Sequence, residues 1–339
     1  MKYLYAILSG SSDAAYEPLA FASATGQFET ITDGTLAVVV SDSTLDSFTE
    51  LQRGDLMRYL AQHQRAVETL MAVSPVLPIK FGTVLSDAEQ VRSVLYLGRE
   101  EFRQALALVG DRHEVDVAVT WDTQRIFTEI AGQPEVAAIR NQVAALPPDK
   151  TMAGRVAIGR LVKEMFDTRR NQVRDELVGE ISPAAYRWRL NPVMDDSMVM
   201  NVACLVNAAE EEALEDAVYA LDERYQDRLN FRLVGPLPPY SFATVEARAI
   251  SAADLDQACA LLALKDHDST PEQVKHAYYN QARRYHPDAV GDDPVARSQF
   301  VRLTQAYKLM TEIAQRVPAG AFGNNGSPYI LVKVGGPEG

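Results

Sequence analysis

The pattern of hydrophobic residues changes near residue 250. Before that point, short apolar runs typical of strands alternate with longer segments of helical periodicity, whereas residues 254–313 have helical periodicity throughout. A chain of 339 residues is long enough for two or three domains. We therefore expect an α+β part of about 250 residues, made of two packed subdomains, followed by a small all-α domain.

The individual elements follow from the same patterns. Strands are expected at residues 3–8, 36–40, 79–85, 115–121, 198–206, 231–234, 241–247 and 329–334. Helices are expected at residues 56–73, 89–109, 153–180 and 210–225, before the helical domain. A stretch rich in Gly, Asn, Ser and Pro at residues 318–328 is typical of a linker. The strand that follows it either returns as an edge strand to the α+β part or stays loose.

Charge and composition exclude several classes of partner. The chain has 33 basic and 46 acidic residues, a net charge of −13, which opposes binding to nucleic acid through phosphate neutralisation. No apolar run approaches the length of a membrane span. Cys204 and Cys259 lie in apolar stretches and predict buried thiols in a reducing compartment. We therefore expect a cytoplasmic protein that binds neither nucleic acid nor membrane.

Catalytic signatures are missing from the sequence. It contains no P-loop, GxGxxG, GxSxG or HExxH motif, and none of its five histidines has a zinc-type spacing with either cysteine. The run Glu210–Glu212 is typical of a solvated helix face. We expect no enzyme activity, no catalytic residue, no metal site and no cofactor.

The helical domain carries the clearest motif, the tripeptide His286, Pro287 and Asp288. Upstream, Thr270 and Gln273 have the spacing of a capping box that starts a helix. Pro287 ends that helix because proline lacks an amide hydrogen and restricts the residue before it. A second helix with its own apolar stripe follows, so two antiparallel helices are expected to present the tripeptide in the loop at their tip.

In this setting the segment at residues 261–310 resembles a J domain of the DnaJ type. The matching residues outside the tripeptide are Leu262, Leu264, Val274, Lys275, Ala277, Tyr278, Tyr285, Phe300, Ala306 and Tyr307. The chain departs from the family at Ala289, where a basic residue usually follows the tripeptide.

The resemblance implies docking on a DnaK-type ATPase chaperone and stimulation of its ATP hydrolysis, with no chemistry in the J domain itself. The residues that the resemblance assigns to this contact are His286, Pro287 and Asp288 as the trigger, with Lys275, Arg283 and Arg284 as the electrostatic face. Charged groups at such an interface mainly set the encounter rate and the register.

The first part resembles the gas vesicle protein F/L family (GvpF/GvpL). The similarity rests on MKYLYAIL at residues 1–8, PVLPIKFGTV at residues 75–84 and GPLPPYSF at residues 235–242. It covers about residues 1–247 in the expected order. It implies an α+β fold with a ferredoxin-like N-terminal subdomain, a second α+β subdomain, and binding of the main shell protein GvpA and other vesicle proteins.

The two resemblances together divide the chain. The expected parts are residues 1–112 and 113–250 as the two GvpF/GvpL subdomains, 251–316 as the J domain, and 317–339 as a linker and tail. Candidate residues for binding the shell protein are Lys80, Phe81, Tyr240 and Phe242. Apolar residues beside turns more often belong to the core, so a structural role for these positions is the stronger expectation.

The sequence is compatible with three functions. The first is a cytoplasmic, gas-vesicle-associated assembly factor or minor vesicle component that binds GvpA and recruits a DnaK-type chaperone. The second is a general J-domain co-chaperone whose α+β part binds clients. The third is an enzyme regulated through the J domain, which no catalytic constellation supports.

Overall fold

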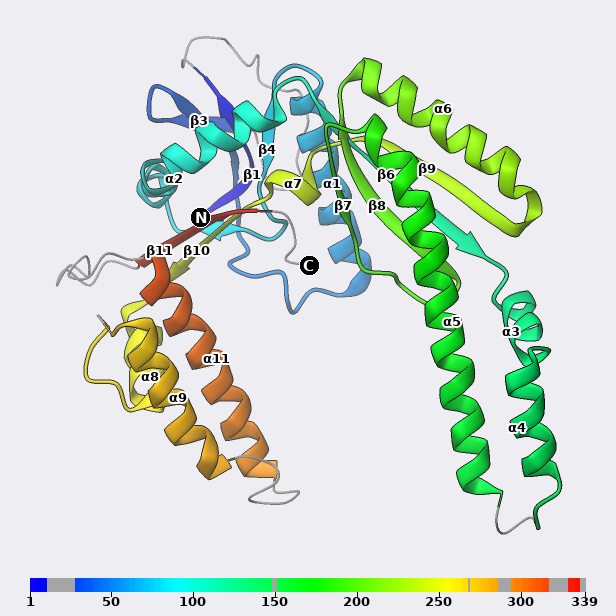
Figure 1. The fold of residues 1–339 in the computed structure, drawn as a ribbon. Coiled ribbons are helices and arrows are strands. Elements are labelled where there is room, and N and C mark those ends of the chain that lie inside the picture. The colour runs from blue at the N-terminus through cyan, green and yellow to red at the C-terminus, as the bar shows by residue number, and fades with distance from the viewer. Residues whose placement is uncertain (11–27, 148–150, 268, 286–293, 317–328, 336–339) are drawn as a thin grey trace.

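The computed structural model describes residues 1–10, 28–147, 151–267, 269–285, 294–316 and 329–335. Within these ranges, two antiparallel sheets with their helices make up the α+β part, and three helices form the domain that follows (Figure 1). The expected fold class, two α+β subdomains followed by a small helical domain, is confirmed. No helix in the described ranges is both long enough and apolar enough to cross a lipid bilayer.

The first sheet lies between two helices. Its strands are β1 (Lys2–Ser9), β2 (Phe28–Thr32), β3 (Leu36–Asp42), β4 (Val76–Pro78) and β5 (Val84–Leu85), and the helices are α1 (Arg53–Met71) and α2 (Ala88–Val109). The order is β2-β3-β1-β4, and β5 also pairs with β1. Helix α2 covers the face with Leu4 and Ile7, and α1 covers the face with Tyr3 and Tyr5. Because both faces are covered, β1 reads as one continuous apolar run.

The second sheet has helices on one face. Its strands are β6 (His113–Trp121), β7 (Arg187–Leu190), β8 (Met198–Val206) and β9 (Leu229–Leu237). The helices are α3 (Thr123–Ala131), α4 (Pro134–Ala144), α5 (Met152–Ile181) and α6 (Ala208–Tyr225). The sheet order β7-β8-β6-β9, with α5 and α6 as the crossovers, is the β-α-β-β-α-β arrangement of ferredoxin-like folds. The ferredoxin-like arrangement therefore belongs to the second sheet, whereas the first sheet has helices on both of its faces.

The helical domain is inserted between the two strands of a ribbon. Its described helices are α8 (Ala252–Leu262), α9 (Pro271–Tyr285) and α11 (Pro294–Arg316), and the ribbon consists of β10 (Val245–Ile250) and β11 (Tyr329–Val334). A short helix, α7 (Tyr240–Ala243), precedes β10. The chain thus leaves the α+β part along β10, forms the three helices and returns along β11 (Figure 1).

Most of the expected elements are present, with two corrections. Residues 79–85 do not form one strand, because the chain turns after Ile79 and Gly82 adopts φ +84°, a conformation that favours glycine. The expected strand at 241–247 starts as helix α7 and becomes strand only from Val245. Strand β2, strand β7 and the helices α3 and α4 were not expected. The divisions at residues 112, 250 and 316 stay predictions.

Candidate functional site

Helix α9 carries the cationic residues assigned to chaperone docking, and its start is set by local hydrogen bonds. The Thr270 amide donates to Gln273 Oε1 at 2.7 Å, and the Gln273 amide donates to Thr270 Oγ1 at 3.3 Å. This is the expected capping box, which satisfies two of the amides that a helix start leaves unpaired. Pro271 occupies the first helical position, where the missing amide hydrogen costs nothing.

The inner face of α9 holds it against α11. Val274 on α9 and Met310 on α11 are fully buried in the core of the helical domain. The rings of Tyr278 and Tyr307 stack with their centroids 4.4 Å apart. These contacts fix the rotation of α9, so they also determine which of its side chains face solvent.

The outer face of α9 is basic. Lys275, Arg283 and Arg284 are exposed, and none of them forms an ion pair with another residue in the described part of the chain. Lys275 and Arg283 share one stripe of the helix with the exposed Tyr279, because they are spaced at four and eight residues. Arg283 and Arg284 lie in the last turn, where the helix dipole favours cations.

The tripeptide His286, Pro287 and Asp288 lies outside the described residues. Its place in the chain is nevertheless directly after Tyr285, the last residue of α9. The cations of the final turn therefore immediately precede the predicted trigger along the chain.

The ribbon joins the helical domain to the α+β part through both of its faces. On one face, Val245, Ala247 and Ala249 of β10 pair with Val334, Val332 and Ile330 of β11, and all six pack against the core beneath α2. On the other face, Ile250 and Leu331 belong to the core of the helical domain. Alternate side chains of a strand point to opposite faces, so each strand contributes to two cores.

Ion pairs flank the same ribbon. Arg248 on β10 lies 3.3 Å from the Glu312 carboxylate on α11. Lys80 Nζ lies 2.9 Å from the Glu246 carboxylate, and the Lys80 amide donates to the Val245 carbonyl at 2.8 Å. Lys80, a candidate for binding the shell protein, therefore helps to attach β10 to the first sheet.

Phe81, the second such candidate, lies in an aromatic cluster under α1. Its ring centroid is 5.3 Å from that of Phe48, 5.7 Å from that of His63 and 6.4 Å from that of Tyr3. The Tyr3 hydroxyl is 2.9 Å from His63 Nδ1. Burial lowers the pKa of His63 to about 4, so the imidazole is neutral near pH 7.

The remaining candidates, Tyr240 and Phe242, are half-buried in α7. Between them, Ser241 makes a contact that the sequence did not reveal. Its amide donates to Glu114 Oε2 at 2.7 Å and its hydroxyl donates to Glu114 Oε1 at 2.8 Å. This pair connects β6 of the second sheet to α7, and α7 itself contacts β4 of the first sheet.

Glu114 is 2 % exposed, and burial raises its pKa from an ordinary value of 4.5 to about 7. The neighbouring carboxylate of Asp116, whose pKa is also raised by burial, adds to that effect. The signal in the sequence was two acidic residues in a strand of otherwise apolar character.

The structure gives the residues of the GPLPPYSF stretch an architectural role, and their binding to a shell protein stays a prediction.

The two cysteines and the clusters of possible metal ligands bear on the chemistry of the chain. Cys204 and Cys259 are buried free thiols, and burial raises their pKa to about 12 and about 11, so neither is a reactive thiolate at neutral pH. Within the described ranges, no group of three or more His, Cys, Asp or Glu side chains is placed to hold a metal ion.

Two protein families match separate parts of the chain. The family described as "Gas vesicle synthesis protein GvpL/GvpF" matches residues 1–244, and the DnaJ domain family matches residues 260–317. Gas vesicle protein F of Microcystis aeruginosa is 25 % identical over 190 residues, which cover 55 % of this chain and 77 % of that protein.

For the helical domain, the chaperone protein DnaJ of Carboxydothermus hydrogenoformans is 39 % identical over 59 residues. They cover 17 % of this chain and 16 % of that protein, so the likeness is confined to one domain. The crystal structure of GvpF from Anabaena sp. PCC7120 superposes with a TM-score of 0.61 at 22 % identity, and covers 71 % of this chain and 96 % of that one. This likeness extends to the fold alone. The chain therefore belongs to the GvpL/GvpF family of gas vesicle proteins and carries a DnaJ domain at residues 260–317.

Proposed function

We propose that this protein is a non-enzymatic gas vesicle assembly factor or minor vesicle component. In this proposal the GvpL/GvpF part binds the shell protein GvpA and other vesicle proteins, and the J domain recruits a DnaK-type chaperone and stimulates its ATP hydrolysis. Family membership over residues 1–244 and the DnaJ domain at residues 260–317 support the two halves of the proposal.

The observation that carries the proposal is the ribbon of β10 and β11. A J domain on a flexible linker would raise the local concentration of chaperone but leave its orientation free. Here the domain is held at both ends, and Ile250 and Leu331 bind its core to the ribbon. The chaperone would therefore arrive at a defined position relative to the client. A strongly apolar shell subunit needs such delivery because exposed apolar surface aggregates.

The basic face of α9 supports the chaperone contact. A cluster of exposed cations in a chain of net charge −13 provides an attractive patch for an acidic partner surface. Because Lys275, Arg283 and Arg284 have no ion-pair partner among the described residues, no internal salt bridge must break before they bind.

The test measures ATP hydrolysis by a DnaK-type chaperone with the full-length chain and GvpA. We expect the wild type to stimulate hydrolysis, His286→Gln to abolish the stimulation, and Arg283→Glu to weaken it by about tenfold through lost charge complementarity. Lys265→Glu is the matched control, since it makes the same change of charge at an exposed loop position of the same domain. A wild-type chain that leaves the hydrolysis rate unchanged would overturn chaperone recruitment.

The client is tested separately, by sedimentation of GvpA with and without the full-length chain. We expect the wild type, His286→Gln and Arg283→Glu to keep GvpA in the supernatant, because neither substitution touches the GvpL/GvpF part. Equal retention of GvpA and of unrelated unfolded chains would favour the general co-chaperone over the assembly factor.

A further inference from the structure

Strand β7 forms one edge of the second sheet. It pairs with β8 on one side, and in the described part of the chain no strand pairs with its other side. Directly after β7, the Asn191 amide donates to the Asn201 carbonyl of β8 at 2.7 Å. Amides alternate in direction along an antiparallel strand, so the amides and carbonyls of Trp188 and Leu190 point away from β8. They are therefore available to a strand added at this edge.

Large apolar side chains are exposed along the same edge. Trp188 is 43 % exposed, and Tyr186, just before the strand, is 47 % exposed. Val193 and Met194, just after the strand, are 39 % and 76 % exposed. Exposed apolar side chains beside an open strand edge favour pairing with another chain. The edge thus offers apolar contact and backbone pairing together.

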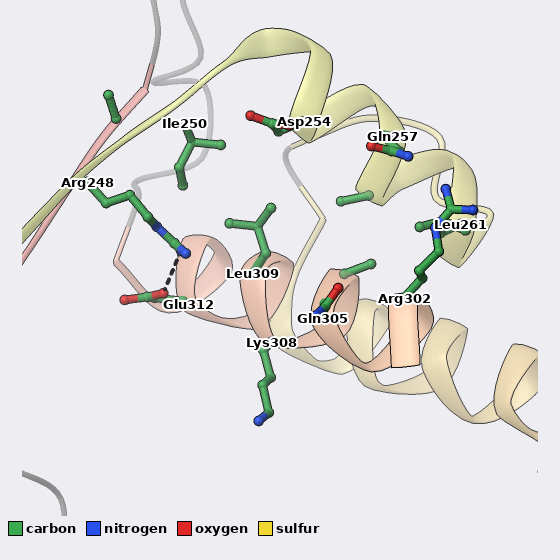
Figure 2. A pocket seen from close by; sticks show the side chains of 13 residues that line it. Arg248, Ile250, Asp254, Gln257, Leu261, Arg302, Gln305, Lys308, Leu309 and Glu312 are labelled. Carbon is green, nitrogen blue, oxygen red and sulfur yellow. Dashed lines mark hydrogen bonds and ion pairs between the residues drawn. The ribbon is translucent and has the colours of Figure 1, made fainter. Parts of the chain in front are cut away.

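The groove between α8, α11 and the end of β10 does not offer a comparable surface (Figure 2). Its floor residues Ala258 and Ala306 are only 3 % and 4 % exposed. At one end of it Arg248 is already paired with Glu312. The edge of β7 is therefore the more accessible of the two surfaces.

The side chains of β7 alternate between two faces of the sheet. Trp188 and Leu190 lie opposite core residues of β8, on the face covered by helices, and Arg187 and Arg189 lie on the other face. Arg187 is exposed and forms no ion pair with any described residue. Arg189 is half-buried, and its Nη1 donates to the Ser241 carbonyl at 3.4 Å. An added strand would meet apolar side chains on one face and an unpaired cation on the other.

The acidic residues near this edge are distant or already engaged. Glu114 and Asp116 share the face of the two arginines but lie on β6, two strands or roughly 10 Å away. Asp195, in the loop after β7, accepts hydrogen bonds within its own loop, and Asp196 lies 3.8 Å from an arginine of α5. The charge of Arg187 is therefore available to a carboxylate of another chain.

We propose that the edge of β7 binds an extended segment of a partner protein in which apolar residues alternate with acidic residues. The segment adds to the sheet as an antiparallel strand. Its apolar side chains lie beside Trp188 and Leu190, and one of its carboxylates lies opposite Arg187. Directly opposite apolar pairs and opposite-charge pairs both stabilise a sheet, so the alternation of β7 determines the alternation of its partner.

A second copy of this chain fits the edge less well. Two antiparallel β7 strands centred on Arg189 would place Arg189 opposite the same residue of the copy. Centred on Trp188, they would place Arg187 opposite the copy's Arg189. Like charges directly opposite each other destabilise a sheet. The arginines therefore favour a partner strand with acidic residues over β7 itself.

The probe is a fluorescein-labelled eight-residue peptide of alternating valine and glutamate, N-methylated at every glutamate. In the antiparallel arrangement the valine amides point to β7 and the glutamate amides point away, so the methyl groups also block self-association of the peptide. The control is the isomer that is N-methylated at every valine. Fluorescence anisotropy with the full-length chain is expected to show saturable binding of the first peptide. The isomer should bind at least about tenfold more weakly, because its hydrogen bonds to the carbonyls of Trp188 and Leu190 are lost.

Three variants test the location. Trp188→Pro removes an outward amide at a position where an edge strand tolerates proline, and should weaken the first peptide by about tenfold or more. Arg187→Glu reverses the charge beside the edge and should weaken it by about fivefold or more. Arg232→Glu is the matched control, because Arg232 is an exposed residue of β9, the opposite edge strand of the same sheet. It should leave binding within twofold. Because all three positions are exposed, circular dichroism is expected to show wild-type spectra.

Three results would overturn the proposal. They are no saturable binding of the first peptide by the wild type, equal or tighter binding of the N-methylvaline isomer, and binding by Trp188→Pro or Arg187→Glu that matches binding by Arg232→Glu. Stimulation of the chaperone ATPase is a separate readout, and all three variants are expected to retain it because β7 lies outside the DnaJ domain. Failure of the peptide to bind and failure to stimulate the chaperone are therefore distinguishable.

Discussion

Ile330 and Leu331 are neighbours on strand β11, yet their side chains are buried in two different hydrophobic cores. Ile330 packs with the first sheet and α2, and Leu331 packs with the three helices of the J domain. The strand comes after the J domain in the sequence and still contributes to the core of the family fold. The two parts are consequently connected by shared burial as well as by the polypeptide chain.

Substituting each of these neighbours should loosen a different part of the molecule. Ile330→Ala and Leu331→Ala each remove a large, almost fully buried side chain, and each should cost about 2–4 kcal/mol of stability. In hydrogen exchange, Ile330→Ala should reduce protection first in α2, and Leu331→Ala first in α11. Gln315→Ala, an exposed change on α11, is the control. An identical exchange pattern in the two variants would contradict the assignment of separate cores.

The buried carboxyl of Glu114 should make stability depend on pH. Its pKa rises from 4.5 to about 7 on folding, so between these values the folded chain binds more protons than the unfolded chain. This group's contribution to stability therefore falls as the pH rises from about 4.5 to about 7, and stays constant above that range.

Glu114→Gln tests this dependence, because the amide oxygen can still accept from Ser241 while the ionisable group is lost. The stability of the variant relative to wild type should improve between pH 5 and pH 8 in urea unfolding. The same difference at both pH values would show that the carboxyl does not titrate in this range.

Gly98 should resist replacement by alanine even though it lies inside helix α2. Helix propensity alone favours alanine by about 1 kcal/mol. A Cβ at this position would overlap the ring of Phe102, which is completely buried and has no room to move. We expect Gly98→Ala to lower the free energy of unfolding by about 1–3 kcal/mol through overpacking, as measured by thermal or urea unfolding. Gly159→Ala on α5, where a Cβ meets nothing within 4 Å, should instead raise the free energy of unfolding by about 0.5–1 kcal/mol.

Phe81 and Lys80 are adjacent, but their substitution should have different effects on stability. Phe81→Ala opens the aromatic cluster around Tyr3 and Phe48 and should cost about 2–4 kcal/mol. Lys80→Ala removes an ion pair whose two side chains are 60 % and 49 % exposed, and should cost less than about 1 kcal/mol. Urea unfolding measures both. Equal losses would mean that the ring of Phe81 is not part of the core.

Prediction from sequence succeeded where a local signal was strong. The capping box of Thr270 and Gln273 was read from three-residue spacing, and strand β8 was placed at the observed bounds because it is a long apolar run. It failed where local and tertiary preferences compete. The stretch after Ile79 looked like a strand, but the positive φ of Gly82 turns the chain there.

The candidate site divides in the same way. The cations of α9 were found from their motif, and the structure places them on an exposed helix face. The contact between Glu114 and Ser241 joins residues 127 positions apart, and no spacing rule indicates such a pair.

The amino-acid sequence by itself determined the family, the presence of the DnaJ domain, the fold class and most helices, because periodicity, capping and motifs are local properties of the chain. Only the tertiary structure decided how residues 329–334 are used. A short apolar strand can pair with any free edge, and its partner depends on which edge lies within reach after the domains have formed. The pairing of β11 with β10 closed the ribbon and fixed the J domain in place.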